Sequence, residues 1–147
     1  MKFISHRGNL TGKEEEFENS PNQILLALSI GYDVEIDVWL IGEYWFLGHD
    51  KPRYRIPKNF LANENLWCHA KNCEALQGML EDKNIHCFWH ENDERTITSK
   101  GYVWTYTGKP VINNGIMVVL ENISQTTLPN YIGGICSDYI LKIKNNL

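Results

Sequence analysis

Two carboxylates stand two positions apart inside an apolar stretch of the sequence, Val34-Glu35-Ile36-Asp37-Val38. Side chains in a β-strand alternate between its two faces, so Glu35 and Asp37 would share one face. Two acids on a buried wall repel each other and lose their hydration, so they require a metal ion, cationic partners or a shared proton. A divalent cation is the simplest solution, and oxygen ligands favour magnesium or calcium. The alternative is an edge strand that holds both acids in water.

Two histidines add groups that can exchange protons. His6 precedes Arg7 at the end of a short predicted strand, and His49 precedes Asp50 after a predicted hairpin. An imidazole titrates near neutral pH and can exchange a proton with a reacting oxygen. The forked guanidinium of Arg7 suits a phosphate group. A lone histidine is more often structural than catalytic, but the combination indicates a site that handles a phosphate.

Strands and helices alternate along the first half of the chain, which is typical of parallel α/β architecture. In a parallel barrel the ends of successive strands meet at one rim, where such enzymes hold their sites. Strand patterns cover residues 3–6, 34–38, 44–47, 66–71, 85–89, 102–106, 115–120 and 134–140, and helix patterns cover residues 21–30 and 73–80.

The length of the chain limits this architecture. Divided over eight units, 147 residues leave about 18 each, against about 30 for one βαβ unit and about 250 for a full barrel. Residues 91–101 and 106–115 are too short and too rich in Gly, Pro and Thr for good helices. We therefore predict an α/β fold, a shortened TIM-type (β/α) barrel with several helices reduced or missing, as a single domain over residues 1–147. An open α/β sheet is the alternative.

Four short motifs follow one another in the first third of the chain: His6-Arg7-Gly8, Glu18-Asn19-Ser20, residues 31–38 and Gly48-His49-Asp50. In order and spacing they resemble the glycerophosphodiester phosphodiesterase family, a branch of the phospholipase-C-like phosphodiesterase superfamily of TIM barrels. The family signature reads His-Arg-Gly, Pro-Glu-Asn-Thr/Ser, Gly-Ala-Asp…Glu-Leu-Asp-Val and then His-Asp. The match covers residues 4–50, and residues 134–139 resemble the Gly…Asp-Tyr-Pro of the family's closing strand more weakly.

The resemblance implies roles for the matching residues. Glu35 and Asp37 would bind a divalent metal ion. His6 and His49 would be the general acid and the general base, in an order that the sequence does not assign. Arg7 would contact the phosphate.

The family has a further acidic metal ligand on its third strand, two residues before a lysine. Here His69 occupies the position of the carboxylate and Lys71 that of the lysine, on one face of the same strand. An imidazole lowers the charge of the ligand set, which makes manganese or zinc possible beside magnesium or calcium. Lys71 would supply a second positive group to the phosphate.

Several residues are predicted as accessory. Asn19 and Asp50 belong to the matching motifs, and His90 or Glu91 could reach the same rim from the end of a fourth strand. Trp104 could form an apolar wall of the site, although packing in the core is an equal alternative.

These features predict a metal-dependent phosphoric diester hydrolase that acts on a glycerophosphodiester-like substrate of lipid metabolism. Attack by a neighbouring substrate hydroxyl would instead give a cyclic phosphate, a lyase-like outcome. The chain lacks the long stretch that shapes the family's pocket after His49-Asp50, so its leaving group could differ. The alternative function is a degenerate, non-catalytic barrel that binds a phosphorylated ligand or a protein partner.

Composition excludes some other classes. A net charge of -4 leaves no basic surplus for coating nucleic acid. No apolar run approaches the roughly 20 residues that span a bilayer. The first residues turn polar too soon for a signal peptide, so we expect a cytoplasmic protein. A shortened barrel would leave apolar strand surface uncovered, which makes a homodimer a further hypothesis.

Overall fold

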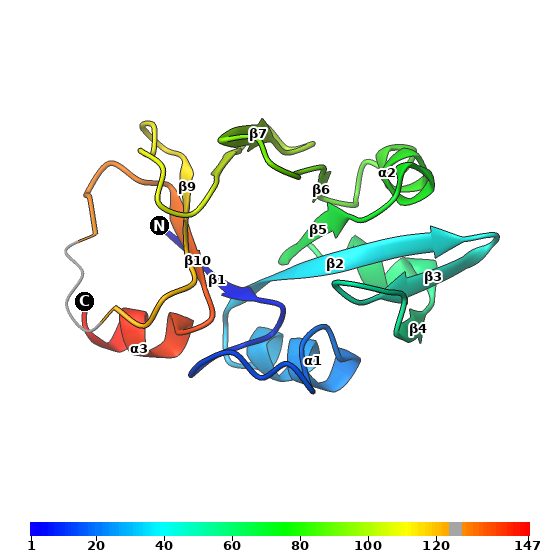
Figure 1. Ribbon diagram of the computed structural model, residues 1–147, viewed down its shortest axis with the longest axis horizontal. Coiled ribbons are helices and arrows are strands. Elements are labelled where there is room, and N and C mark those ends of the chain that lie inside the picture. Colours follow the sequence, from blue (N-terminus) through cyan, green and yellow to red (C-terminus); the bar gives the residue numbers. More distant parts are fainter. Residues whose placement is uncertain (124–127) are drawn as a thin grey trace.

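Ten strands form one mixed sheet in the computed structural model, which describes residues 1–123 and 128–147 (Figure 1). Figure 1 shows the helices at the periphery, with α1 and α3 along one side of the molecule. The strands are β1 (Lys2–His6), β2 (Asp33–Ile41), β3 (Tyr44–Leu47), β4 (Tyr54–Ile56), β5 (Leu66–Ala70), β6 (Cys87–Phe88), β7 (Arg95–Ile97), β8 (Val103–Thr105), β9 (Ile116–Val119) and β10 (Gly134–Ser137). The helices are α1 (Pro21–Ser29), α2 (Cys73–Leu80), α3 (Ile140–Asn145) and a short 3-10 helix, η1 (Lys58–Ala62).

Parallel pairing organises the centre of the sheet. Strand β1 lies between β2 and β10, and parallel pairs continue through β5 to β6 on one side and through β9 to β8 on the other. Strands β3 and β4 extend the far half of β2 as an antiparallel meander, and β7 pairs antiparallel with β8. The carboxyl ends of β1, β2, β5 and β10 therefore lie at the same end of the sheet.

The predicted shortened TIM-type (β/α) barrel is wrong. A meander of β3 and β4, rather than a helix, follows β2, because Gly42 makes the tight turn of a hairpin with φ of 60°. After α2, the described connections between β6 and β9 contain no α-helix, since residues 91–101 and 106–115 are short and rich in Gly, Pro and Thr. The result is a mixed sheet with three short α-helices in the described chain, not a ring of alternating β/α units.

The first helix begins and ends where the sequence predicts. Ser20 caps α1 by accepting a hydrogen bond from the backbone N–H of Gln23 at 3.3 Å, and Pro21 opens the helix. Gly31 follows the helix with a φ of 88°, a conformation that favours glycine. The buried face of α1 belongs to the same apolar core as Val34 and Ile36 of β2, so the helix fixes which face of β2 is apolar.

The opposite face of the parallel strands holds a second core of aromatic and aliphatic side chains. It contains Ile4 of β1 and Trp67 of β5, together with side chains of β6, β8, β9 and β10. Residues two positions apart share a face of a strand, so Ile4 and Trp67 precede His6 and His69 on this face. An apolar floor therefore lies beneath the polar carboxyl ends of β1 and β5.

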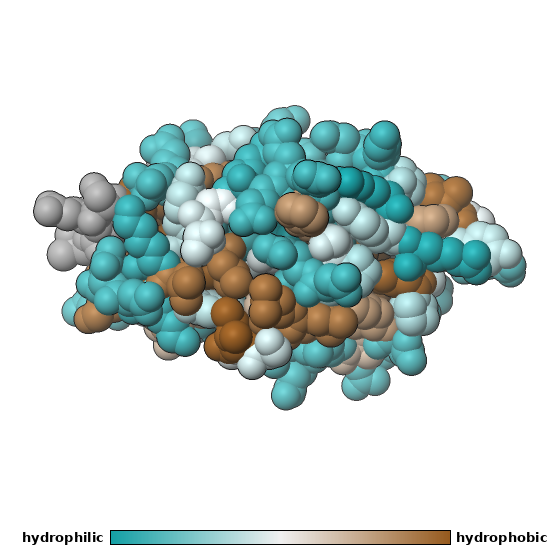
Figure 2. All heavy atoms as spheres, turned by 90° about the horizontal axis from the view of Figure 1, so that it is seen from below, coloured by the Kyte–Doolittle hydropathy of each residue, from teal (hydrophilic) through white to brown (hydrophobic). Residues whose placement is uncertain are grey.

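One outer face of the molecule carries a band of apolar side chains among polar ones (Figure 2). Figure 2 shows a band of apolar side chains across the side that carries α1, where Leu25, Leu26 and Ile30 are exposed. Within the described chain, none of the helices has the length and apolar character that crossing a membrane would require. The homodimer stays a prediction.

Candidate functional site

Strand register brings most of the predicted site residues together. Parallel pairing places His6 beside Glu35 and Asp37 beside His69. Lys71 follows β5 directly, and its backbone N–H donates to Val38 O at 2.8 Å. The polar side chains at the carboxyl ends of β1, β2 and β5 therefore lie next to one another.

Most of these polar side chains line a cavity of about 350 Å³. Asp37 does not line this cavity, because it is fully buried behind Arg7 and His69. Asn19 lies behind Asp37, and Asp50 lies on the exposed side of His49. The lining residues are His6, Arg7, Glu35, His49, His69, Lys71, His90, Glu91, Trp104, Tyr106, Thr107, Val118 and Leu120.

Asp37 is held by cations and by one amide. Its Oδ2 lies 2.9 Å from Arg7 Nε and accepts a hydrogen bond from Asn19 Nδ2 at 2.9 Å. Asn19 Oδ1 in turn accepts from the backbone N–H of Asp37 at 2.8 Å. Burial alone would raise the pKa of Asp37, but its contact with His69 and the charge of Arg7 outweigh burial and hold the pKa well below its usual range. Asp37 is therefore an anion that Asn19 fixes in place.

His69 faces both carboxylates with one ring nitrogen. Its Nε2 donates to the carbonyl of His90 at 2.8 Å, and its ring stacks on Phe88 with centroids 5.0 Å apart. This leaves Nδ1 at 3.5 Å from Glu35 Oε1 and 3.4 Å from Asp37 Oδ1. Burial opposes the charged imidazole, but the two carboxylates prevail and raise the pKa of His69 to about 9. The ring therefore has an orientation fixed by the fold, with Nδ1 aimed between two anions.

The donor set at this point fits a divalent cation. Ligand atoms of Glu35, Asp37 and His69 lie within 4.8 Å of one another. Glu35 Oε2 and Asp37 Oδ1 are buried and accept no hydrogen bond from the described residues. A buried carboxylate oxygen without a donor is costly, and a bound cation would satisfy both oxygens at once. The hydrogen bond from His69 Nε2 to a carbonyl is the outer contact that usually orients a metal-binding histidine.

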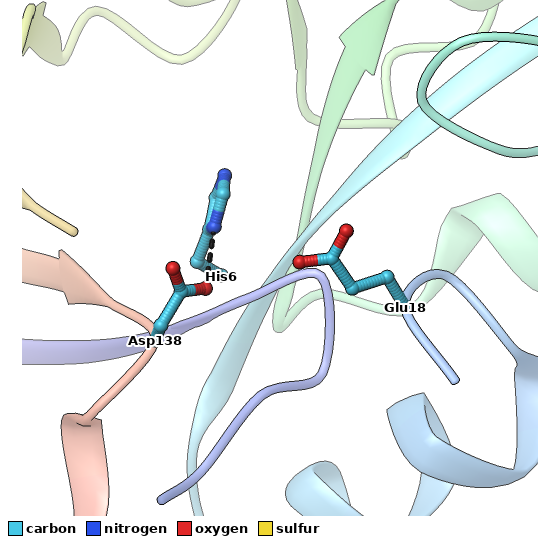
Figure 3. A group of neighbouring side chains, drawn as sticks. All are labelled: His6, Glu18 and Asp138. Carbon is cyan, nitrogen blue, oxygen red and sulfur yellow. Dashed lines mark hydrogen bonds and ion pairs between the residues drawn. The ribbon is translucent and has the colours of Figure 1, made fainter. Parts of the chain in front are cut away.

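Asp138 is a residue of the site to which the sequence analysis gave no role. His6 Nδ1 lies 2.7 Å from Asp138 Oδ1 (Figure 3). Asp138 Oδ1 also accepts from Asn9 Nδ2 at 2.7 Å. Its signal in the sequence was the weak match at residues 134–139. Strand register supplies the reason, because β10 pairs Ser137 with Ser5 and so places Asp138 beside His6.

The contact with Asp138 sets the charge and direction of His6. Burial would lower the pKa of His6, but the hydrogen bond with Asp138 and the charge of Glu35 raise it above its ordinary value. With Nδ1 turned to Asp138, Nε2 faces Glu35 Oε2 at 3.8 Å and the cavity. His6 thus presents a single nitrogen to a bound molecule.

Glu18 completes a second group of possible metal ligands with His6 and Asp138, drawn in Figure 3. In this structure the side-chain amide of Asn9 links the two carboxylates of the group. Asn9 Nδ2 donates to Glu18 Oε1 at 2.9 Å and also to Asp138 Oδ1. Glu18 Oε2 accepts from Arg7 Nη1 at 3.3 Å. The network therefore links Arg7 to His6 and orients both.

His49 reaches the cavity from the loop after β3. Its Nδ1 pairs with Asp50 Oδ1 at 2.8 Å, and its side chain is 41 % exposed. The loop depends on Gly48, whose φ is 152° and at which a Cβ atom would overlap Lys51 O. Trp39 Nε1 anchors the loop by donating to Gly48 O at 2.6 Å.

The remaining predicted residues lie at the edges. His90 Nε2 donates to Asp93 O at 2.6 Å, and its ring meets Tyr106 edge-on. Glu91 is exposed at the cavity rim. Trp104 combines the two alternatives considered for it, since it packs on Phe88 in the apolar floor and also lines the cavity.

Comparisons with protein-family models, curated proteins and solved structures found no match for this chain. The resemblance to the glycerophosphodiester phosphodiesterase family therefore rests on the motifs alone.

Proposed function

We propose that the chain is a metal-dependent phosphodiesterase that cleaves a glycerophosphodiester-like substrate. One observation carries the proposal: His6 and His49 line the same cavity as Glu35 and His69, whose ligand atoms converge with those of Asp37. Histidines that exchange protons and a divalent cation that stabilises charge on the phosphoryl oxygens are two kinds of catalysis that can act together in phosphodiester cleavage.

The chain's own cations would bind the phosphodiester anion. Arg7 and Lys71 line the cavity, and Lys71 Nζ lies 3.8 Å from Asp37 Oδ1. Their charges favour the additional negative charge that builds up on the phosphoryl oxygens in the transition state. A divalent ion held by Glu35, Asp37 and His69 would supply further Lewis-acid stabilisation when bound.

His6 and His49 would move the protons. One imidazole takes the proton of the attacking oxygen, and the other gives a proton to the leaving alcohol as the P–O bond breaks. If the attacking oxygen is water, the products are a phosphomonoester and an alcohol. If it is a neighbouring hydroxyl of the substrate, the products are a cyclic phosphate and the same alcohol.

A second candidate function is binding of a phosphorylated ligand without turnover. The observation that favours it is His69, because an imidazolium at Nδ1 can pair with both carboxylates and offset one of their two charges in place of a metal ion. Such a site would still hold a phosphate through Arg7 and Lys71.

Hydrolysis of bis(p-nitrophenyl) phosphate distinguishes the two functions. The protein is treated with EDTA and then assayed with magnesium, calcium, manganese or zinc, with His49→Ala as the inactive control. We expect release of p-nitrophenol with at least one metal and none from the variant. No release with any of the metals, together with phosphate binding, would favour the binding function.

A further inference from the structure

A second cavity of about 370 Å³ adjoins the first one. The two cavities share Arg7 and His49 in their walls. A phosphodiester held by Arg7 and within reach of His49 would therefore lie where the cavities meet. Its two substituents would point into different surroundings.

The second cavity has more cations than its own acids neutralise. Glu15 pairs with Lys13 at 2.6 Å, and Asp50 pairs with His49 at 2.8 Å. Lys51 and Arg53 also line this cavity, and neither forms an ion pair with a carboxylate in residues 1–123 or 128–147.

Glu18, the third acid of this cavity, is likewise neutralised. Its two oxygens accept from Arg7 Nη1 at 3.3 Å and from Asn9 Nδ2 at 2.9 Å. Counting histidine as neutral, the lining has four cations, Arg7, Lys13, Lys51 and Arg53, against the three carboxylates Glu15, Glu18 and Asp50, a surplus of one positive charge. Lys51 and Arg53 have no carboxylate partner within the described residues, so a bound anion can pair with them.

The first cavity differs on the side away from its charged residues. There its wall consists of Trp104, Val118 and Leu120, with the half-exposed ring of Tyr106 at the rim. This wall offers apolar contacts and a ring face, and it has no cation of its own. A substituent on this side gains from being apolar or planar.

We propose that the second cavity is a subsite for an acidic substituent of the substrate, a carboxylate or a phosphate, bound by Lys51 and Arg53. The opposite substituent then lies on the apolar wall of the first cavity. This assignment rests on the proposed function, because it is the reacting phosphodiester that places one substituent in each cavity. It narrows the substrate to an unsymmetrical diester with one acidic arm.

Two synthetic diesters of the same shape test the subsite. One is p-nitrophenyl 3-carboxyphenyl phosphate, and the other is its neutral analogue, p-nitrophenyl 3-carbamoylphenyl phosphate. We expect kcat/KM to be about ten-fold higher for the carboxylate at moderate ionic strength, as two solvent-accessible ion pairs would give. A ratio near one, with both diesters hydrolysed, overturns the subsite and leaves the proposed function intact.

Variants identify the cations responsible. The double variant Lys51→Gln/Arg53→Gln should reduce the ratio to about one, whereas the control Arg55→Gln/Lys58→Gln removes the same charge outside both cavities and should keep it. Persistence of the preference in Lys51→Gln/Arg53→Gln would also overturn the assignment. Circular dichroism establishes that each variant is folded.

Calorimetric binding of the same two diesters in EDTA separates this proposal from the proposed function. If neither compound is hydrolysed with any metal but the wild type binds the carboxylate about ten-fold more tightly, the subsite stands and the hydrolase does not. Equal affinities for the two compounds would remove the subsite whether or not the protein is an enzyme.

Discussion

Asp138 holds the ring of His6 from a position 132 residues away in the sequence, with 2.7 Å between Oδ1 and Nδ1. The contact exists because β10 lies parallel to β1, in a register that aligns the last residue of β1 with the residue just after β10. Asn9 donates to the same carboxylate oxygen and so restricts its movement. The imidazole ring of His6 is thereby held in one orientation, and proton transfer to a bound substrate depends on such an orientation.

Loss of the Asp138 carboxylate should reduce turnover. We expect Asp138→Ala to reduce kcat by about ten- to hundred-fold with little change in KM, because a misdirected imidazole loses part of the roughly 10²- to 10⁴-fold that general acid–base catalysis contributes. Asp138→Asn keeps an oxygen for Nδ1 but loses the charge, so its kcat should lie between those of wild type and Asp138→Ala. Steady-state kinetics and the pH profile of kcat are the measurements. An Asp138→Ala variant with wild-type kcat would show that the contact is only structural.

Removal of the His49 imidazole should abolish most activity without harming the fold. The side chain is partly exposed, and within the described residues its polar contact is with Asp50, so His49→Ala should unfold at the wild-type temperature. Loss of a general acid or base typically reduces kcat by about 10²- to 10⁴-fold. Asp50→Ala keeps the imidazole and removes only its partner, so its kcat should lie between those of wild type and His49→Ala. Equal rates for His49→Ala and wild type would contradict the assigned role.

The metal preference of the proposed site should depend on His69. His69→Asp adds a hard, charged ligand beside Glu35 and Asp37, so we expect magnesium and calcium to bind about ten-fold more tightly and zinc more weakly. Titration calorimetry on EDTA-treated protein measures each affinity. His90→Asp is the control, because it adds the same charge at the cavity edge, outside the ligand cluster.

Removal of the Glu35 carboxylate should weaken metal binding. Glu35→Gln should lose most of the metal affinity, and added manganese should then no longer raise its melting temperature. Tight binding that survives in Glu35→Gln would place the metal elsewhere.

Local patterns in the sequence were sufficient to predict the acidic wall. Alternation along a strand predicts that Glu35 and Asp37 share a face, and the structure buries both on one face while Val34, Ile36 and Val38 pack in the core on the other. The caps at Ser20 and Asn72 likewise mark the starts of α1 and α2, because capping depends on neighbouring residues.

Features that depend on distant pairing could not be predicted in this way. The barrel expectation failed because strand order alone does not say whether a connection carries a helix. Strand β4 extended the predicted hairpin of β2 and β3, and β7 paired antiparallel with β8. Asp138 was missed as a partner of His6 for the same reason. Its place follows only from the pairing of the first and last strands, which no local pattern reports.

The stability of the metal-free protein should decrease in alkaline solution because of His69. Its pKa is about 9 in the folded protein, against an ordinary value of 6.5, so folding favours the protonated ring. The resulting stabilisation is complete below about pH 6.5 and is lost as the pH rises through about 9. In EDTA, the free energy of unfolding should therefore decrease by on the order of 3 kcal/mol across this window.

Urea unfolding at several pH values from 6 to 10 measures this decrease. His6, whose pKa is also raised, contributes in the same direction, so the comparison that isolates His69 is with His69→Asn. The variant should be less stable than wild type at pH 6 and should show a shallower decrease. Saturating manganese should also flatten the wild-type curve, because metal and proton compete for Nδ1. An equally steep decrease in His69→Asn would show that Nδ1 is not protonated between the two carboxylates.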